Sequence, residues 1–210
     1  RELRSSEYHY RGLIESLSAI AWEADTTDYT YSYVSPHAEA LLGYPLQSWL
    51  EPGFWLRILH PEDASWARDY CAEQTAAGVG HSLEYRVITA DGRSLWVRDI
   101  VSLIKHDQRP VMRGLMIDIS ETKKIEEAQR LSEQKFASVF RQCPDILVIA
   151  RLRDGCLLEV NEAFEEQIGL KAAQVVGRRA AELDIWGVDG VAPRLLKRLQ
   201  GGSIRNLEMT

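Results

Sequence analysis

Cysteine is scarce in this sequence, and a long apolar run is absent. The cysteines Cys71, Cys143 and Cys156 are odd in number, and their spacing matches neither a C-x-x-C metal site nor a disulfide framework. We therefore expect a reducing compartment, the cytoplasm. No apolar stretch approaches the ~20 residues that span a bilayer, and residues 1–10 lack the apolar region of a signal peptide. We expect no direct membrane contact of this segment, although a membrane-anchored parent protein is compatible with the sequence.

Positive charge is in short supply as well. The chain has 25 Lys and Arg against 31 Asp and Glu, which gives a formal net charge of −6. Phosphate binding requires an excess of Lys and Arg on at least one face, so a nucleic-acid partner is disfavoured. The hydrophobic content of 45% is typical of a packed globular protein, and 210 residues suffice for one large or two ordinary domains.

Side chains suited to catalysis form one compact cluster, His60, Glu62 and Asp63. A metal or hydrolytic site is one interpretation, which would make the protein a small metalloenzyme centred on His60. Against it, successive residues around Pro61 point in divergent directions, no second cluster completes a coordination shell, and helix capping explains all three side chains. We therefore predict no catalytic residue and no metal ligand.

The chain does contain an internal repeat. Residues 5–25 align with residues 131–151, so that Ser6 falls on Ser132, and the register continues without a gap until Gly43 falls on Gly169. Identity is low, but the chemical class of the side chains persists. Chance alignment of two helix-and-strand segments is the alternative, and the gapless register favours duplication.

Periodicity predicts the elements of the first copy. Apolar residues at Tyr10, Leu13, Ile14 and Leu17 indicate an amphipathic helix. Two strands follow in residues 19–36, then several short helices, a longer helix from Pro61, and three more strands, which is an α+β arrangement with an Asp91-Gly92 hairpin turn. The period of two predicts that one face of the sheet is lined by Leu83, Tyr85, Val87, Leu95, Val97, Leu115 and Ile117.

Three stretches in order resemble the PAS sensory-domain family: YVSPHAEALLGYP at 33–45, HPED at 60–63 and DISETKKIEEA at 118–128, with DGRSLWVRD between the last two. VNEAFEEQIGLKAAQVVG, at 160–177, resembles a second PAS domain. The resemblance implies a five-stranded antiparallel sheet with short helices on one face, duplicated in tandem through a helical linker. The expected division is an N-terminal amphipathic helix at 1–18, a first PAS domain at 19–120, the linker at 121–143, and a second PAS domain at 144–210 that lacks its last strands.

The family commonly binds a cofactor between sheet and helices. The side chains expected around such a pocket are Trp22, Trp55, Trp66, Tyr85 and Trp96, although simple core packing explains them too. Residues 37–60 contain no Cys for a light-driven flavin adduct, and residues 61–78 contain no His for haem. Flavin and haem stay open, but we favour a domain that binds no cofactor. If either copy binds a ligand, we expect the first, because it holds all five strands and every His.

The resemblance also assigns a role to Asp118, Ile119 and Ser120, which close the last strand and begin the helical linker. The Ser120 hydroxyl is expected to cap this helix. We expect a sensory module that forms a homodimer through its exposed helical apolar stripes and regulates a linked output domain, such as a histidine kinase or a cyclic-di-GMP enzyme. A ligand-free dimerisation spacer is the alternative, and a solvated spacer explains the charges of the linker equally well.

Overall fold

The computed structural model describes residues 19–106 and 109–183. The chain divides into two compact units, residues 1–127 and 128–210, and each is described by itself. The predicted amphipathic helix at 1–18 and the end of the second copy from residue 184, with Trp186, lie outside the described residues.

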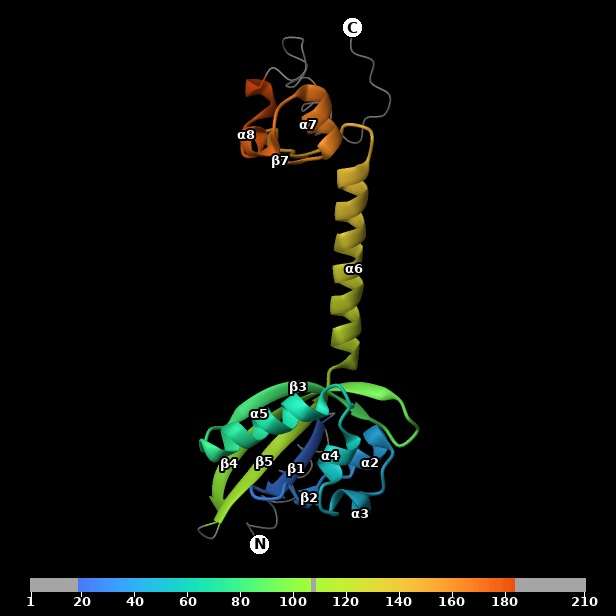
Figure 1. Ribbon diagram of the computed structural model, residues 1–210, viewed down its shortest axis with the longest axis vertical. Helices are drawn as coiled ribbons and strands as arrows, with labels where there is room; N and C mark the ends of the chain where they lie inside the picture. The colour runs from blue at the N-terminus through green and yellow to red at the C-terminus, as the bar shows by residue number, and fades with distance from the viewer. Residues whose placement is uncertain (1–18, 107–108, 184–210) are drawn as a thin grey trace. The chain divides into compact units, whose positions relative to one another are not determined.

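The first unit is built on a five-stranded antiparallel sheet, as predicted. Its strands are β1 (Ala19–Asp25), β2 (Tyr31–Val34), β3 (His81–Ile88), β4 (Ser94–His106) and β5 (Arg109–Asp118), in the spatial order β2-β1-β5-β4-β3 (Figure 1). The β3–β4 hairpin turns at Gly92, whose φ of 82° is a left-handed conformation that glycine adopts without strain. The first unit therefore places its first strand, β1, beside its last one, β5, which is the central strand of the sheet.

The helices of this unit lie between β2 and β3 in the sequence. They are α2 (His37–Leu42), α3 (Leu46–Trp49), α4 (Phe54–Ile58) and α5 (Ala64–Ala76). Figure 1 shows α5 lying across the strands. Pro61 was predicted to begin α5, but residues 61–63 form a turn and the helix begins at Ala64. Short helices broken by Pro45, Pro52 and Gly53 thus cover one face of the sheet and bury their apolar sides against it.

The core between sheet and helices follows the predicted alternation in β3 and β4 but not in β5. Leu83, Tyr85, Val87 and Val97 are buried on the face that meets the helices, and Leu95 is partly buried against them. In β5 the buried side chains are instead Met112 and Met116, so the prediction for Leu115 and Ile117 is wrong. The register is set by Gly114, which pairs with Trp22 and turns the even-numbered residues of β5 inward.

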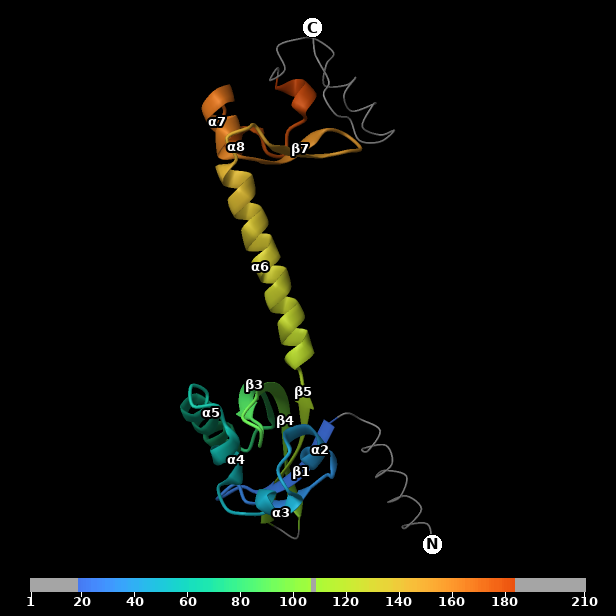
Figure 2. The same ribbon diagram turned by 90° about the vertical axis from the view of Figure 1, so that its right-hand side faces the viewer.

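Residues predicted to form the linker lie in α6, a continuous helix over Ser120–Gln142 that follows the end of β5 (Figure 2). It is the longest helix among the described residues. Most of its side chains are exposed, including the apolar Ile125, Phe136 and Val139. No helix in the described ranges is both long and apolar enough to cross a membrane.

The second unit begins its described part with a hairpin and short helices. The elements are β6 (Val148–Arg151), β7 (Cys156–Val160), α7 (Glu162–Ile168), α8 (Ala172–Val175) and η1 (Ala180–Glu182). Leu157, Phe164, Val175 and Ala180 form its buried core.

The hydrogen bonds of the two units repeat in the register that the sequence predicts. Trp22 of β1 pairs with Val34 of β2, and Val148 of β6 pairs with Val160 of β7. In each hairpin the register shifts before the second residue after this pair, at Ala24 and at Ala150. Both first helices end on a left-handed glycine. The described part of the second copy therefore has the same local geometry as the start of the first.

In each copy, a side chain just after the second strand accepts a hydrogen bond from the backbone of the first strand or the residue before it. The residue at this position is Ser35 in the first copy and Asn161 in the second. The Ala21 amide donates to Ser35 Oγ at 3.0 Å, and the Leu147 amide donates to Asn161 Oδ1 at 2.9 Å. Because both side chains offer an oxygen at the right place, the contact survives the change of residue.

Candidate functional site

A buried carboxyl group lies at the centre of the first unit. Asp99 of β4 is only 3% exposed, because it occupies an inward position between Val97 and Val101. Trp22 Nε1 donates to Asp99 Oδ1 at 2.9 Å, and Tyr85 Oη donates to Asp99 Oδ2 at 2.9 Å. The carboxyl group is thereby tied to β1 and β3, the strands on either side of the β4–β5 pair.

Two further residues complete this arrangement. Trp55 Nε1 of α4 donates to Tyr85 Oη at 2.9 Å, which extends the network from the sheet to the helices. Gly114 lies under the Trp22 ring: a Cβ there would overlap the indole and lie 2.7 Å from the Ile100 carbonyl oxygen. Glycine is therefore required for Trp22 to reach across β5 to Asp99.

The electrostatics of the network centre on Asp99. Burial raises the pKa of this carboxyl group to about 7, even though the hydrogen bonds from Trp22 and Tyr85 oppose the rise. Burial also raises the pKa of the Tyr31 and Tyr85 phenols and of the Cys71 thiol, so these groups are neutral near pH 7. Asp99 is thus the member of this group that changes charge near neutral pH.

A second arrangement lies where the sheet meets α6. The Ile119 amide donates to the Trp96 carbonyl oxygen and the Trp96 amide donates to Ser120 Oγ, each at 2.9 Å. The Ser120 amide donates to Asp118 Oδ1 at 2.8 Å. The prediction that Ser120 caps the helix is wrong, because its hydroxyl accepts from β4 and the Asp118 carboxylate covers the first helical amide instead.

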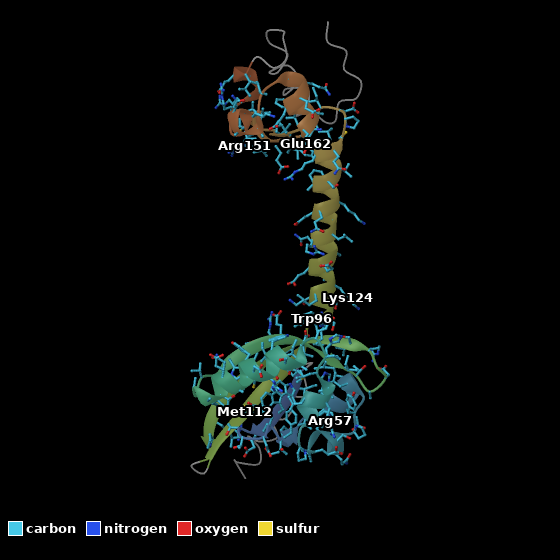
Figure 3. The ribbon with its side chains drawn as sticks, in the orientation of Figure 1. Arg57, Trp96, Met112, Lys124, Arg151 and Glu162 are labelled. Carbon is cyan, nitrogen blue, oxygen red and sulfur yellow. The ribbon has the colours of Figure 1, made fainter. Side chains whose placement is uncertain are left out.

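Side chains reinforce this junction. Lys123 Nζ lies 2.7 Å from Glu84 Oε2 of β3, and the same glutamate pairs with Arg98 of β4 at 2.6 Å. The Trp96 ring lies under the Lys123 ammonium and the Arg86 guanidinium, at 5.4 and 5.5 Å from its centroid. Figure 3 shows Trp96 where the sheet meets the first turn of α6. The helix is therefore held by β3 and β4 together.

Two residues of the cluster that suggested a metal site, Glu62 and Asp63, form ion pairs with Arg86 of β3 instead. Arg86 donates to both carboxylate oxygens of Asp63, at 2.7 and 2.9 Å, and to Glu62 Oε2 at 2.8 Å. These bonds to Arg86 lower the pKa of Asp63 to about 2. The capping role predicted for Asp63 is wrong, since its side chain makes no cap hydrogen bond. In the described ranges, no group of three His, Cys, Asp or Glu residues is placed to hold a metal ion.

Comparison with known families agrees with this architecture. A family model described as PAS fold matches residues 31–116, and a second, described as PAS domain, matches residues 134–202. The chain belongs to the PAS domain family. The chain is also similar in fold to the crystal structure of a sensory box histidine kinase/response regulator from Burkholderia thailandensis, with a TM-score of 0.51 at 22% identity, covering 61% of this chain and 98% of that one.

Curated proteins and a further solved structure are similar to this chain as well. Sensor protein FixL of Bradyrhizobium diazoefficiens is 23% identical over 172 residues, and the uncharacterized protein y4lL of Sinorhizobium fredii is 25% identical over 178 residues. These alignments cover 81% and 84% of this chain but only 34% and 21% of those proteins. The N-terminal domain of a diguanylate cyclase with PAS/PAC sensor from Marinobacter aquaeolei is 36% identical with a TM-score of 0.47, covering 50% of this chain and 98% of that one.

Of the five side chains predicted around a PAS pocket, the structure brings together Trp22, Trp55 and Tyr85. Trp66 lies on the outer side of α5, 43% exposed, with its indole nitrogen 3.5 Å from Asp63 Oδ1. Trp96 points away from the core, because it alternates with the buried Val97 along β4. Asp99 was missed, although an acid in the inward series of β4 is itself a signal of a buried polar site.

The space in this PAS core is small. A cavity of about 20 Å³ lies beside Asp99, lined also by Trp22, Tyr31, Trp55 and Cys71. Sites for molecules of drug size enclose ~300–1,000 Å³. A flavin or a haem therefore does not fit among these side chains as they are placed.

Proposed function

We propose that the chain is the sensory input module of a longer signalling protein. The first PAS domain, residues 19–120, passes its state through the linker at 121–143 to the second PAS domain at 144–210. The module has no catalytic role of its own. It regulates an output domain elsewhere in the parent protein, such as a histidine kinase or a cyclic-di-GMP enzyme.

The observation that carries this proposal is the attachment of α6 to β4. Trp96 exchanges hydrogen bonds with Ile119 and Ser120, while Asp99 lies on the same strand only three residues further along. A displacement of β4 that follows a change at Asp99 is therefore transmitted directly to the first turn of α6. Paired backbone and side-chain bonds make this a specific route rather than a loose tether.

The comparisons support an input role within a longer chain. The Bradyrhizobium relative is named a sensor protein, and this chain spans 34% of its length. The three cysteines are free thiols, which supports the proposed cytoplasmic location.

Hydrogen exchange in the 210-residue chain tests the relay. We expect the protection factors of amides 121–126 to change between pH 6 and pH 8, as Asp99 loses its proton, and to lose this response in Ser120→Ala. Ser132→Ala is the matched control, because Ser132 is an exposed serine later on the same helix. The relay is contradicted if the protection factors of these amides do not change with pH, or if they change equally in Ser120→Ala.

A second candidate function, dimerisation, is favoured by the apolar side chains exposed on α6. Ile125 is 61% exposed, Phe136 56% and Val139 70%, and residues spaced by 11 and 14 along a helix lie on nearly the same side. We propose that a second copy of the chain covers this stripe in a homodimer.

Sedimentation at concentrations on the order of tens of micromolar tests this proposal. Val139→Glu is expected to shift the chain toward monomer, and Ser138→Glu, which adds the same charge at the adjacent exposed position, is expected not to. A monomer in the unmodified chain would reject the homodimer.

A further inference from the structure

The cavity beside Asp99 has the size of a single small polar group. Its volume of about 20 Å³ exceeds the ~10–15 Å³ that one water-sized group requires. Aromatic rings of Trp22, Tyr29, Tyr31 and Trp55 line it together with the carboxyl group. An acidic group enclosed by aromatic rings is the arrangement that recognises organic cations, because the ring faces and the carboxylate both attract positive charge.

A separate surface groove lies along the same elements. Its volume is about 420 Å³, and it is lined mainly by apolar and small side chains of α5, β4 and β5. Along β4 and β5, and just past the end of β1, the groove takes a position two residues from one that lines the cavity, and on α5 it takes the next turn. The corresponding pairs are Ala24 and Thr26, Val101 and Leu103, Met112 and Pro110, and Cys71 and Thr75.

Tyr29 separates the two spaces. It lines both the cavity and the groove, and its ring packs 5.6 Å from the Trp55 ring. Its φ of 59° makes it the one described non-glycine residue with positive φ. This conformation is strained for a bulky side chain, and such strain gathers at ligand clamps and switches.

We propose that the first PAS domain binds a small organic cation, a primary alkylammonium or arylammonium, with its ammonium group beside Asp99 and its apolar body in the groove. The ring of Tyr29 turns aside to admit the ligand. This inference rests on the proposed sensory function and names its ligand class. It also explains why an acid is placed in the core with no Lys or Arg among the residues that line the cavity.

The charge of the site selects the cation. The titratable groups that face Asp99 are Tyr31 of β2, Cys71 of α5 and Tyr85 of β3, with Tyr29 at the entrance, and each has a raised pKa and is neutral near pH 7. Strands β1 and β5 contribute Trp22 and Met112, which do not titrate. The negative charge of an ionised Asp99 is therefore not neutralised by the groups that face it. The site attracts a cation and repels an anion of the same shape.

Calorimetry and NMR with hexylammonium chloride test the proposal on the 210-residue chain. We expect binding of hexylammonium, a shift of the Trp22 indole N–H resonance, and no binding of hexan-1-ol or hexanoate. Affinity should rise about tenfold from pH 6 to pH 8, because the bound form needs an ionised Asp99 while the ligand stays protonated. Asp99→Asn should weaken binding by about 30-fold or more, and Asp69→Asn, an exposed acid on α5, should not.

Other results would overturn the site. Equal binding of hexan-1-ol, or an affinity that does not change with pH in the unmodified chain, removes the carboxylate from recognition even if Asp99→Asn fails to fold. Tyr29→Gly should speed association, since it removes the ring and suits the positive φ; an unchanged rate contradicts the gate. Failure of hexylammonium to bind, with α6 still responding to pH, rejects this ligand class and leaves the relay standing. Binding of hexylammonium without a response in α6 rejects the relay and leaves the ligand class standing.

Discussion

Asp99→Asn changes the pH dependence of stability in a way that the structure predicts in sign and size. Burial raises the pKa of Asp99 from an ordinary value of 3.8 to about 7. The folded chain therefore keeps this proton up to about pH 7, whereas the unfolded chain releases it near pH 4. Between these values the unfolded state binds fewer protons, so stability falls as pH rises.

The magnitude follows from the same shift. One pKa unit corresponds to about 1.4 kcal/mol, so the full contribution of Asp99 between pH 3 and pH 8 is about 4 kcal/mol. Between pH 5.5 and pH 8, about 2 kcal/mol of this contribution should be lost. Asparagine cannot ionise, and its side-chain oxygen still accepts a hydrogen bond from Trp22 or Tyr85. The variant should therefore lack this slope.

Urea unfolding followed by tryptophan fluorescence measures the effect. Trp22, Trp49 and Trp55 report on the core that surrounds Asp99. The comparison is made between the unmodified chain and Asp99→Asn, because the two carry the same other titratable groups. Parallel curves of stability against pH, or a stability that rises from pH 5.5 to pH 8 in the unmodified chain relative to the variant, would refute the assignment of a raised pKa to Asp99.

Three other substitutions have expected outcomes. Val97→Ala should lower the free energy of unfolding by ~1–3 kcal/mol, because Val97 is fully buried; Val79→Ala, at a half-exposed position, should stay within about 0.5 kcal/mol. Gly114→Ala should cost about 1–3 kcal/mol through overlap with Trp22 and shift the Trp22 indole resonance, and an unshifted resonance contradicts the packing. Ala128→Pro should break α6 at a cost of about 3 kcal/mol or more, seen as lost helical circular dichroism, whereas Ala128→Gln should preserve it.

The sequence predicted what depends on local periodicity. Strand β3 alternates Leu83, Tyr85 and Val87 with polar residues, so its buried face could be read without the structure. Strand β5 could not be read in this way, because it has apolar residues on both faces and its register depends on Gly114 meeting Trp22. That contact joins residues far apart in the chain, and periodicity carries no information about it.

The candidate site was predicted in part for a related reason. The aromatic residues of the sequence indicate Trp22 and Trp55 correctly, but they also include Trp66. Trp66 lies on the exposed side of α5, and the packing of this helix on the sheet decides which side is exposed. The role of Ser120 was equally open, since a hydroxyl can bond either to its own helix or to a neighbouring strand. Only the tertiary fold brings the Trp96 amide within reach and decides between them.

The side chain of Asn161 has a mechanical consequence. Ser35, at the matching position of the first copy, bonds the hairpin alone, whereas Asn161 Nδ2 also donates to the carbonyl oxygens of Cys143 and Asp145, at 3.1 and 2.8 Å. The segment that leaves α6 is thus fastened to the second hairpin, as the first turn is fastened to β4. Each end of α6 is therefore held by a side-chain hydrogen bond as well as by the peptide chain, so neither end is a free joint within the unit that it adjoins.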